Sequence, residues 1–216
     1  MCLCVCVPVP SSIFDRRNET IFAKSRRLWS AGISHCATFL QHPEVQKLLH
    51  SPHHHFDAII VEAFFYECFL GFAHRFKVAI IQVCSMGVTH WMGDWVGNPN
   101  PYSYVPDIFL HYSHHMNLWE RFINTLAGIY WRIGQEFYNI PRQEAVMKEF
   151  FNFTEPPPPL TELLRKTSLL LVNNHFSLNY PKPLMPNVIE VGGMHLRPPK
   201  ELPEVRHAIL FCVTSN

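Results

Sequence analysis

The chain has 216 residues, of which 48% are hydrophobic and 16% are charged. This composition excludes an intrinsically disordered chain, which combines low hydrophobicity with high net charge. The length suffices for one domain with its own core, or at most two small ones. Because 18 Lys and Arg nearly balance 17 Asp and Glu, the net charge of +1 gives no long-range attraction to nucleic acid or to an anionic membrane.

The seven cysteines are an odd number and fall into two groups. Three alternate at the start of the chain (Cys2, Cys4 and Cys6), where a strand would point all three thiols the same way, as binding of a soft metal requires. No second cysteine cluster in the sequence completes such a site. Four are scattered among apolar neighbours: Cys36, Cys68, Cys84 and Cys212. Their surroundings are typical of small buried hydrophobic residues, and their spacing predicts no disulfide framework.

The sequence shows no clear membrane helix. Its longest apolar stretch, residues 58–73, is interrupted by Glu62 and Glu67, which is not typical of a bilayer span. The first ten residues lack a basic segment and carry Pro8 and Pro10, so they do not predict a signal peptide.

The first half of the chain reads as helix, helix, strand, helix and strand. A helical period covers residues 20–40, and Pro43 is suited to the first turn of a short second helix. The run FDAIIVEA, residues 56–63, predicts a strand that is buried on both faces. Aromatic residues then recur at helical spacing, and a second apolar run covers residues 78–83. This order is a βαβ unit.

The second half begins with a segment of no regular period. Residues 85–112 hold three glycines, three prolines and two tryptophans, which predicts a long aromatic loop. A helix is expected over residues 113–140, and Pro141 is expected to break it before a second helix. A polyproline connector then leads to strands at residues 168–174 and 187–193.

An apolar stripe runs along the helix expected at residues 113–140. Its members are Trp119, Phe122, Ile123, Leu126, Ile129, Tyr130, Ile133 and Phe137. The pattern favours a helix packed on the core, and contact with a partner or a membrane face is the alternative.

Alternating strands and helices predict an α/β open sheet of parallel strands. Ligands bind to such sheets beyond the carboxyl ends of the strands. Glu62 ends the first strand and Ser85 follows the second, so both become candidate site residues. The alternative for Glu62 is to stabilise the N-terminus of the next helix.

Three blocks, in this order, carry a resemblance to a known family. They are FDAIIVEAFFYECFLGFAHRF, IIQVCSMGVTHWMGDWVGNPNPYSYVP and SLLLVNNHFSLNYPKPLMPNVIEVGGMH, the last followed by PPKELPE. The chain resembles the N-terminal half of insect UDP-glycosyltransferases (UDP-glucuronosyltransferases) over about residues 20–205. The resemblance implies a Rossmann-like acceptor-binding domain of a GT-B glycosyltransferase, whose second domain binds the UDP-sugar. It divides the chain into an atypical segment (1–19), a partial acceptor-binding domain (20–196), and a linker start with an atypical tail (197–216).

The resemblance also implies the chemistry. In the family a histidine takes the proton of the acceptor hydroxyl, UDP leaves with inversion, and a carboxylate holds the imidazole. The carboxylate motif FDxxxxDA matches at Glu62, where glutamate replaces aspartate. None of the 14 histidines matches the base by motif, and the UDP-sugar signature and the membrane anchor are absent from the 216 residues. We therefore expect this chain alone to be inactive, with the UDP-sugar as co-substrate and no further cofactor.

Residues around the second strand end are candidates for the wall of the acceptor pocket: Ser85, Met86, His90, Trp91 and Trp95. Small-molecule pockets are mostly apolar with few polar groups, which this set matches. Ordinary packing within the loop is the alternative.

Other motifs are weaker. Two histidine groups, residues 53–55 and His111 with His114 and His115, favour a solvated surface over a metal site because no zinc spacing matches. Asn18 and Asn152 begin glycosylation sequons, which matter only in a secretory compartment and also arise by chance. Gly192-Gly193 favours a tight turn over a phosphate site.

Three functions remain open at this stage. The first is a UDP-glycosyltransferase part, which transfers glucose or glucuronate to small lipophilic acceptors in the complete enzyme. The second is a non-catalytic protein that modulates intact family members, as homo- or hetero-oligomers, through exposed apolar surface. The third is a module that sequesters lipophilic molecules. The resemblance places the full-length family in the endoplasmic reticulum, and no nucleic-acid partner is expected.

Overall fold

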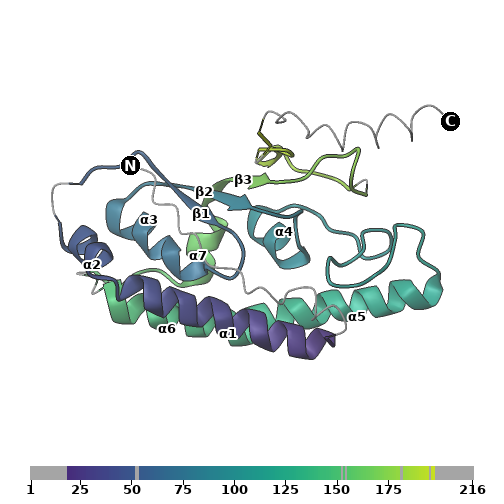
Figure 1. Cartoon of the computed structure of the whole chain (residues 1–216), viewed down its shortest axis with the longest axis horizontal. Coiled ribbons are helices and arrows are strands. Elements are labelled where there is room, and N and C mark those ends of the chain that lie inside the picture. Colours follow the sequence, from purple (N-terminus) through teal and green to yellow (C-terminus); the bar gives the residue numbers. More distant parts are fainter. Residues whose placement is uncertain are drawn as a thin grey trace, which may run out of the picture.

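A computed structural model of the chain describes residues 19–51, 54–151, 153, 155–180, 182–194 and 196–197. The helices, shown in Figure 1, are α1 (Ile21–Leu40), α2 (Pro43–His50), η2 (Glu67–Leu70), α3 (Gly71–Phe76), α4 (His90–Val96), α5 (Leu118–Gly134), η3 (Gln135–Asn139), α6 (Ile140–Phe151) and α7 (Leu160–Arg165). The strands are β1 (Ala58–Glu62), β2 (Ala79–Cys84), β3 (Thr167–Val172) and β4 (Val188–Glu190).

The four strands form one parallel sheet in the order β1-β2-β3-β4. This confirms the predicted α/β class. The register sets Glu62 beside Val83, and Val172 beside both Cys84 and Glu190. The carboxyl ends of all four strands therefore meet along one edge of the sheet.

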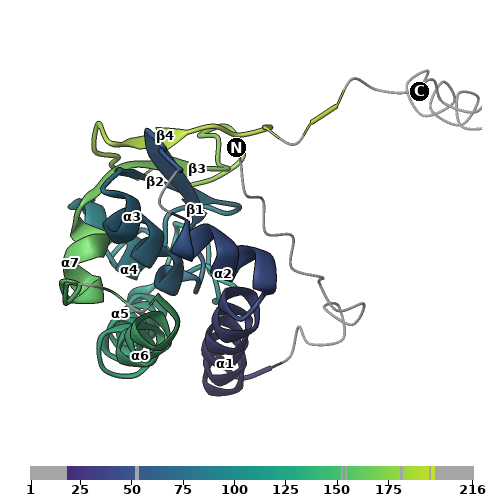
Figure 2. The ribbon, with the colours of Figure 1, turned by 90° about the vertical axis from the view of Figure 1, so that its left-hand side faces the viewer.

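The helices lie on one side of this sheet, in two layers (Figure 2). α3, α4 and α7 are next to the strands, and α1, α5 and α6 lie beyond them. On the side without helices, Ile60 is 51% exposed and Ile189 is 41% exposed. Strands of a parallel sheet are usually covered on both faces, so this side is open in the described part of the chain.

α1 forms because Thr20 caps its N-terminus and because its buried residues recur at three- and four-residue spacing. Gly32 lies so close to the next layer that an added Cβ would come within 2.3 Å of the Phe65 carbonyl oxygen. The close approach brings Cys36 against Cys68, and the two form a disulfide. Both cysteines are buried, as their apolar neighbours predicted, but the bond between them was not predicted, because pairing depends on packing that sequence spacing does not encode.

The segment at 85–112, predicted as an aromatic loop, contains the helix α4. The Thr89 side chain accepts a hydrogen bond from the Met92 N–H and so caps α4, and Gly97, with φ of 73°, ends it. A helix of seven residues has too few turns to show a period.

The predicted break at Pro141 is also wrong. α5, η3 and α6 follow one another without interruption, and Pro141 is the second residue of α6. Proline removes a helical N–H and its ring clashes with the preceding turn. The wider π-helical turn of η3 lies directly before α6, within the turn that precedes Pro141, and accommodates the ring.

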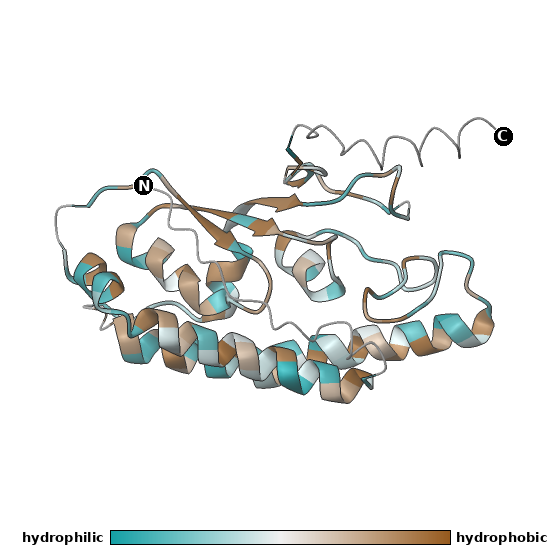
Figure 3. Cartoon of the chain, viewed as in Figure 1, coloured by the Kyte–Doolittle hydropathy of each residue, from teal (hydrophilic) through white to brown (hydrophobic). Residues whose placement is uncertain are grey.

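The apolar stripe of α5 faces away from the core, contrary to the favoured prediction. The residues that α5 buries are Asn124, Ala127, Gly128 and Trp131. Exposed residues along its outer side are Trp119, Phe122, Leu126, Ile129 and Ile133, and Phe137 of η3 continues the row. Brown bands mark apolar residues along α5 in Figure 3. The small residues allow a close approach, since an added Cβ at Gly128 would lie 2.1 Å from the Tyr102 ring.

No helix in the described part of the chain is both long and apolar enough to cross a membrane.

Candidate functional site

The carboxyl edge of the sheet brings two predicted residues together. Glu62, the last residue of β1, accepts a hydrogen bond of 3.2 Å from the Ser85 hydroxyl, directly after β2. Both side chains are exposed. A carboxylate and a hydroxyl thus stand side by side where parallel sheets bind their ligands.

The backbone after β1 fixes the position of Glu62. The Ala63 N–H donates to the Val83 carbonyl at 2.8 Å, which extends the sheet pairing by one residue. Phe65 then adopts φ of 62°, a left-handed conformation that is costly for a bulky side chain. The Phe65 carbonyl is held at 2.9 Å by the Gln143 amide, so packing against α6 stabilises the turn.

Polar residues that sequence reasoning missed continue this edge across β3 and β4. The Asn173 amide donates to the Ser85 carbonyl at 3.3 Å, and the Asn174 amide donates to Glu190 at the end of β4. Lys182 donates to the Val88 carbonyl at 3.2 Å, and its burial lowers the pKa of its ammonium group. The signal was present as Asn-Asn directly after the apolar run of β3.

Glu67 is buried near this turn among side-chain amides. Its carboxylate accepts hydrogen bonds from the amides of Gln135 at 3.2 Å, Asn139 at 3.3 Å and Gln143 at 2.5 Å. Burial raises the pKa of Glu67 to about 7, and the three amide bonds partly oppose that rise. The residue ties η2 to η3 and α6.

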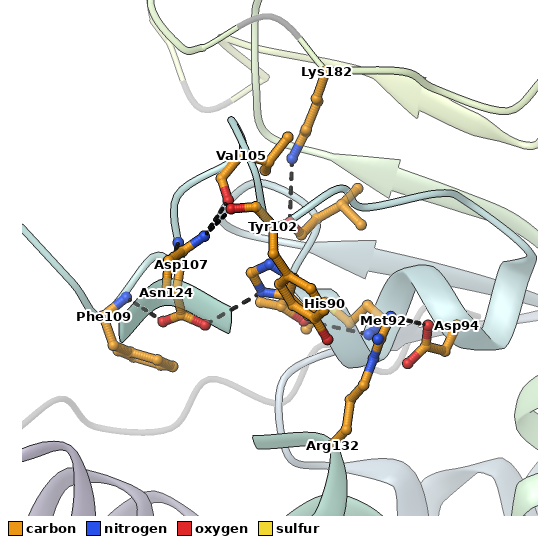
Figure 4. Close-up of polar contacts among 12 residues, drawn as sticks. His90, Met92, Asp94, Tyr102, Val105, Asp107, Phe109, Asn124, Arg132 and Lys182 are labelled. Carbon is orange, nitrogen blue, oxygen red and sulfur yellow. Dashed lines mark hydrogen bonds and ion pairs between the residues drawn. The ribbon is translucent and has the colours of Figure 1, made fainter. Parts of the chain in front are cut away.

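His90 lies in the interior and not at the sheet edge. Its Nδ1 atom is 3.3 Å from a carboxylate oxygen of Asp107, and both side chains are almost fully buried (Figure 4). The Tyr102 ring stacks on the imidazole with centroids 4.7 Å apart. The contact between His90 and Asp107 joins α4 to the loop that follows it. Within that loop, Asp107 also accepts a hydrogen bond of 2.9 Å from the Phe109 N–H.

Trp91 and Trp95 belong to a separate place. Both line a cavity of about 300 Å³ between α4, the α5–α6 junction and α7, whose lining includes neither Glu62 nor Ser85. Trp91 is also almost completely buried among aromatic rings. The predicted pocket residues therefore divide: Ser85 and the half-buried Met86 follow the end of β2, whereas the two tryptophans lie along α4.

Within the described ranges, no three His, Cys, Asp or Glu side chains are grouped so that they could hold a metal ion. Several residues singled out in the sequence lie outside the described residues: Cys2, Cys4, Cys6, Asn18, His53, Asn152 and Cys212.

Comparison with known proteins gives a direct family assignment. The model of the family described as UDP-glucoronosyl and UDP-glucosyl transferase matches residues 12–211. The chain belongs to this family. The three sequence blocks and the parallel sheet are therefore those of a UDP-glycosyltransferase, and the predicted Rossmann-like N-terminal architecture is confirmed.

The chain is similar to several UDP-glycosyltransferases of known name. It is 34% identical to UDP-glucosyltransferase 2 of Dactylopius coccus over 72% of this chain and 32% of that protein. It is 31% identical to UDP-glucuronosyltransferase 3A1 of Bos taurus over 79% of this chain and 31% of that protein. It thus spans about a third of the length of these relatives. No solved structure matches the chain.

Proposed function

We propose that this chain is the acceptor-side part of a UDP-glycosyltransferase that transfers glucose or glucuronate to small lipophilic alcohols or phenols. One observation carries the proposal. The carboxylate that matches the family motif, Glu62, stands exposed at the carboxyl edge of a parallel sheet and is oriented by the Ser85 hydroxyl. An acceptor hydroxyl that reaches this edge meets a fixed anionic group.

The proposed reaction follows the inverting course of the family. A histidine base takes the acceptor proton, the acceptor oxygen bonds to the anomeric carbon of the sugar, and the bond from that carbon to UDP breaks. Glu62 stabilises the imidazolium that forms and holds its ring in place. Because no histidine of this chain matches the base and no UDP-sugar signature is present, the 216 residues alone are proposed to be inactive.

The endoplasmic reticulum lumen is the proposed location. The disulfide between Cys36 and Cys68 supports an oxidising compartment, since cytosolic proteins rarely keep such a bond.

Acceptor binding tests the proposal without requiring turnover. In calorimetry with 1-naphthol and no UDP-sugar, we expect binding, and Glu62→Gln is expected to weaken it roughly 5- to 10-fold because a hydrogen bond to a charged acceptor becomes a neutral one. Glu149→Gln, which alters an exposed glutamate on α6, is the matched control and should bind as the parent does.

Turnover is the second arm of the test. With UDP-glucose or UDP-glucuronic acid and 1-naphthol, the chain should form no glycoside above background. Glycoside formation would contradict the proposed inactivity, and equal naphthol affinity of the Glu62 and Glu149 variants would contradict the acceptor site. Naphthol binding that Glu62→Gln leaves unchanged would favour the alternative function, a module that sequesters lipophilic molecules.

A further inference from the structure

The outer side of α5, continued by η3, carries six apolar residues that the described fold leaves uncovered. This α5 seam consists of Trp119, Phe122, Leu126, Ile129, Ile133 and Phe137, which are 42–76% exposed. Isolated exposed apolar residues are normal on protein surfaces, whereas a contiguous row of them marks an interaction site.

The spacing of the seam specifies what kind of surface fits it. From Trp119 to Ile133 the residues follow at intervals of three, four, three and four, which is the 3.5-residue repeat of a helix that packs against another helix. Phe137 comes four residues later instead of three, and the π-helical turn of η3 lies at this point. An extra residue in a helical turn delays the next seam position by about one. The repeat therefore continues through η3.

The opposite side of α5 holds the helix in place. Asn124 receives the Asp107 N–H at 2.7 Å and donates to the carbonyls of Tyr102 and Val105 at 2.9 and 2.8 Å. Trp131 is completely buried among aromatic rings. The seam is thus presented by a fixed helix, which lowers the entropic cost of binding.

We propose that the α5 seam binds the α5 seam of a second copy of this chain, as an antiparallel helix pair. In that arrangement Leu126 faces Ile129 of the second copy and Phe122 faces Ile133. The two residues of each pair lie at equal distances on either side of the same point of α5, where the two helices cross the two-fold axis. Trp119 then faces Phe137. Every contact occurs twice, as a two-fold interface requires, and the helix dipoles oppose each other.

Surface area and charge both favour this partner. With about 150–250 Å² for a whole large side chain, the exposed fractions leave on the order of 700 Å² of apolar surface on each copy. A standard specific interface buries about 800 Å² per partner. Residues 118–151 carry four Arg or Lys and four Glu, so the helix has no excess of positive charge to attract an anionic lipid surface.

Sedimentation velocity of the full 216-residue chain tests the pairing. The parent should sediment as a dimer at micromolar concentrations. Leu126→Glu and Ile129→Lys should each raise the dissociation constant roughly 30-fold or more, the effect of a central interface residue. Both residues are about half exposed, so the monomers should keep the circular dichroism of the parent. Leu178→Glu, a change at a leucine that is 90% exposed outside the seam, is the matched control and should remain dimeric.

The double variant Leu126→Glu/Ile129→Lys tests the direction of pairing. In the antiparallel pair each new carboxylate faces a new ammonium group, so the double variant should recover dimer, whereas a parallel pair would set like charges together. A monomeric parent would overturn the proposal, as would a double variant that remains monomeric. Flotation of a monomeric parent with phosphatidylcholine vesicles, lost in Leu126→Glu, would overturn it in favour of a lipid surface.

Discussion

At the scale of single residues, the two glutamates near the end of β1 differ in what surrounds them. Glu62 was predicted from a carboxylate that directly follows an apolar strand, and the structure shows it at the sheet edge with Ser85. The environment of Glu67 was not predictable, because its partners Gln135, Asn139 and Gln143 are 68–76 residues away along the chain. Local sequence identifies the strand end, whereas the amide cluster depends on how α6 packs.

Glu67 gives the protein a specific dependence of stability on pH. Burial raises the pKa of Glu67 from 4.5 to about 7 in the folded state. Between these values the unfolded chain has lost the proton that the folded chain keeps, so the free energy of unfolding falls as pH rises, by about 3 kcal/mol from this group. Below pH 4.5 both states hold the proton and the penalty vanishes. Urea unfolding from pH 4.5 to 7.5 measures the slope.

Glu67→Gln isolates that contribution. Since glutamine does not titrate, the variant should show a flatter pH profile, while Glu149→Gln on the surface of α6 should keep the slope of the parent. Parallel profiles for the parent and the Glu67 variant would contradict a protonated, buried carboxyl group.

At the scale of elements, α5 shows that hydrophobic periodicity predicts a helix but not which of its sides is buried. The sequence predicts the helix, since the stripe is strong and Asn117 with Glu120 forms a capping box. It does not tell which side is buried, because the usual inference assigns the apolar side to the core. Here the side with Asn124 and Gly128 is buried instead, since it fits the loop around Tyr102.

Asn124 is therefore expected to control the order of the segment after α4. Asn124→Leu keeps the volume but leaves the Asp107 N–H and the carbonyls of Tyr102 and Val105 without this partner. At about 1–3 kcal/mol for each buried group left unpaired, the variant should lose roughly 3 kcal/mol or more of stability. Urea unfolding measures the loss, and hydrogen exchange should increase in residues 97–117.

The neighbouring change Thr125→Leu provides the control. The Thr125 hydroxyl donates to the Arg121 carbonyl, one helical turn away on the same helix. This variant should change stability by less than about 1 kcal/mol. If it destabilises the protein as much as Asn124→Leu does, the loss arises from α5 in general and not from the tie to the loop.

At the scale of the whole molecule, the sequence predicts the sheet and its helices better than the side-chain contacts that join one layer to the next. The order of apolar runs and helical periods identifies a parallel sheet with helices, and three blocks identify the family. The contacts that join α1 to the middle layer were not visible, because Cys36 and Cys68 lie in separate elements and show no motif. Such links depend on the final packing, which periodicity within one element does not report.

The disulfide between Cys36 and Cys68 is expected to account for much of the stability of the folded chain. It closes a loop of 32 residues, for which the loss of chain entropy in the unfolded state corresponds to about 3–4 kcal/mol. Cys36→Ala/Cys68→Ala should lower the free energy of unfolding by about that amount. Reductant should lower the stability of the parent but not that of the double variant. Cys84→Ala, a change at a buried free thiol, should leave the response to reductant intact. Alkylation of Cys36 in the folded, unreduced chain, detected by mass spectrometry, would show that the bond is absent and would also remove the support for an oxidising compartment.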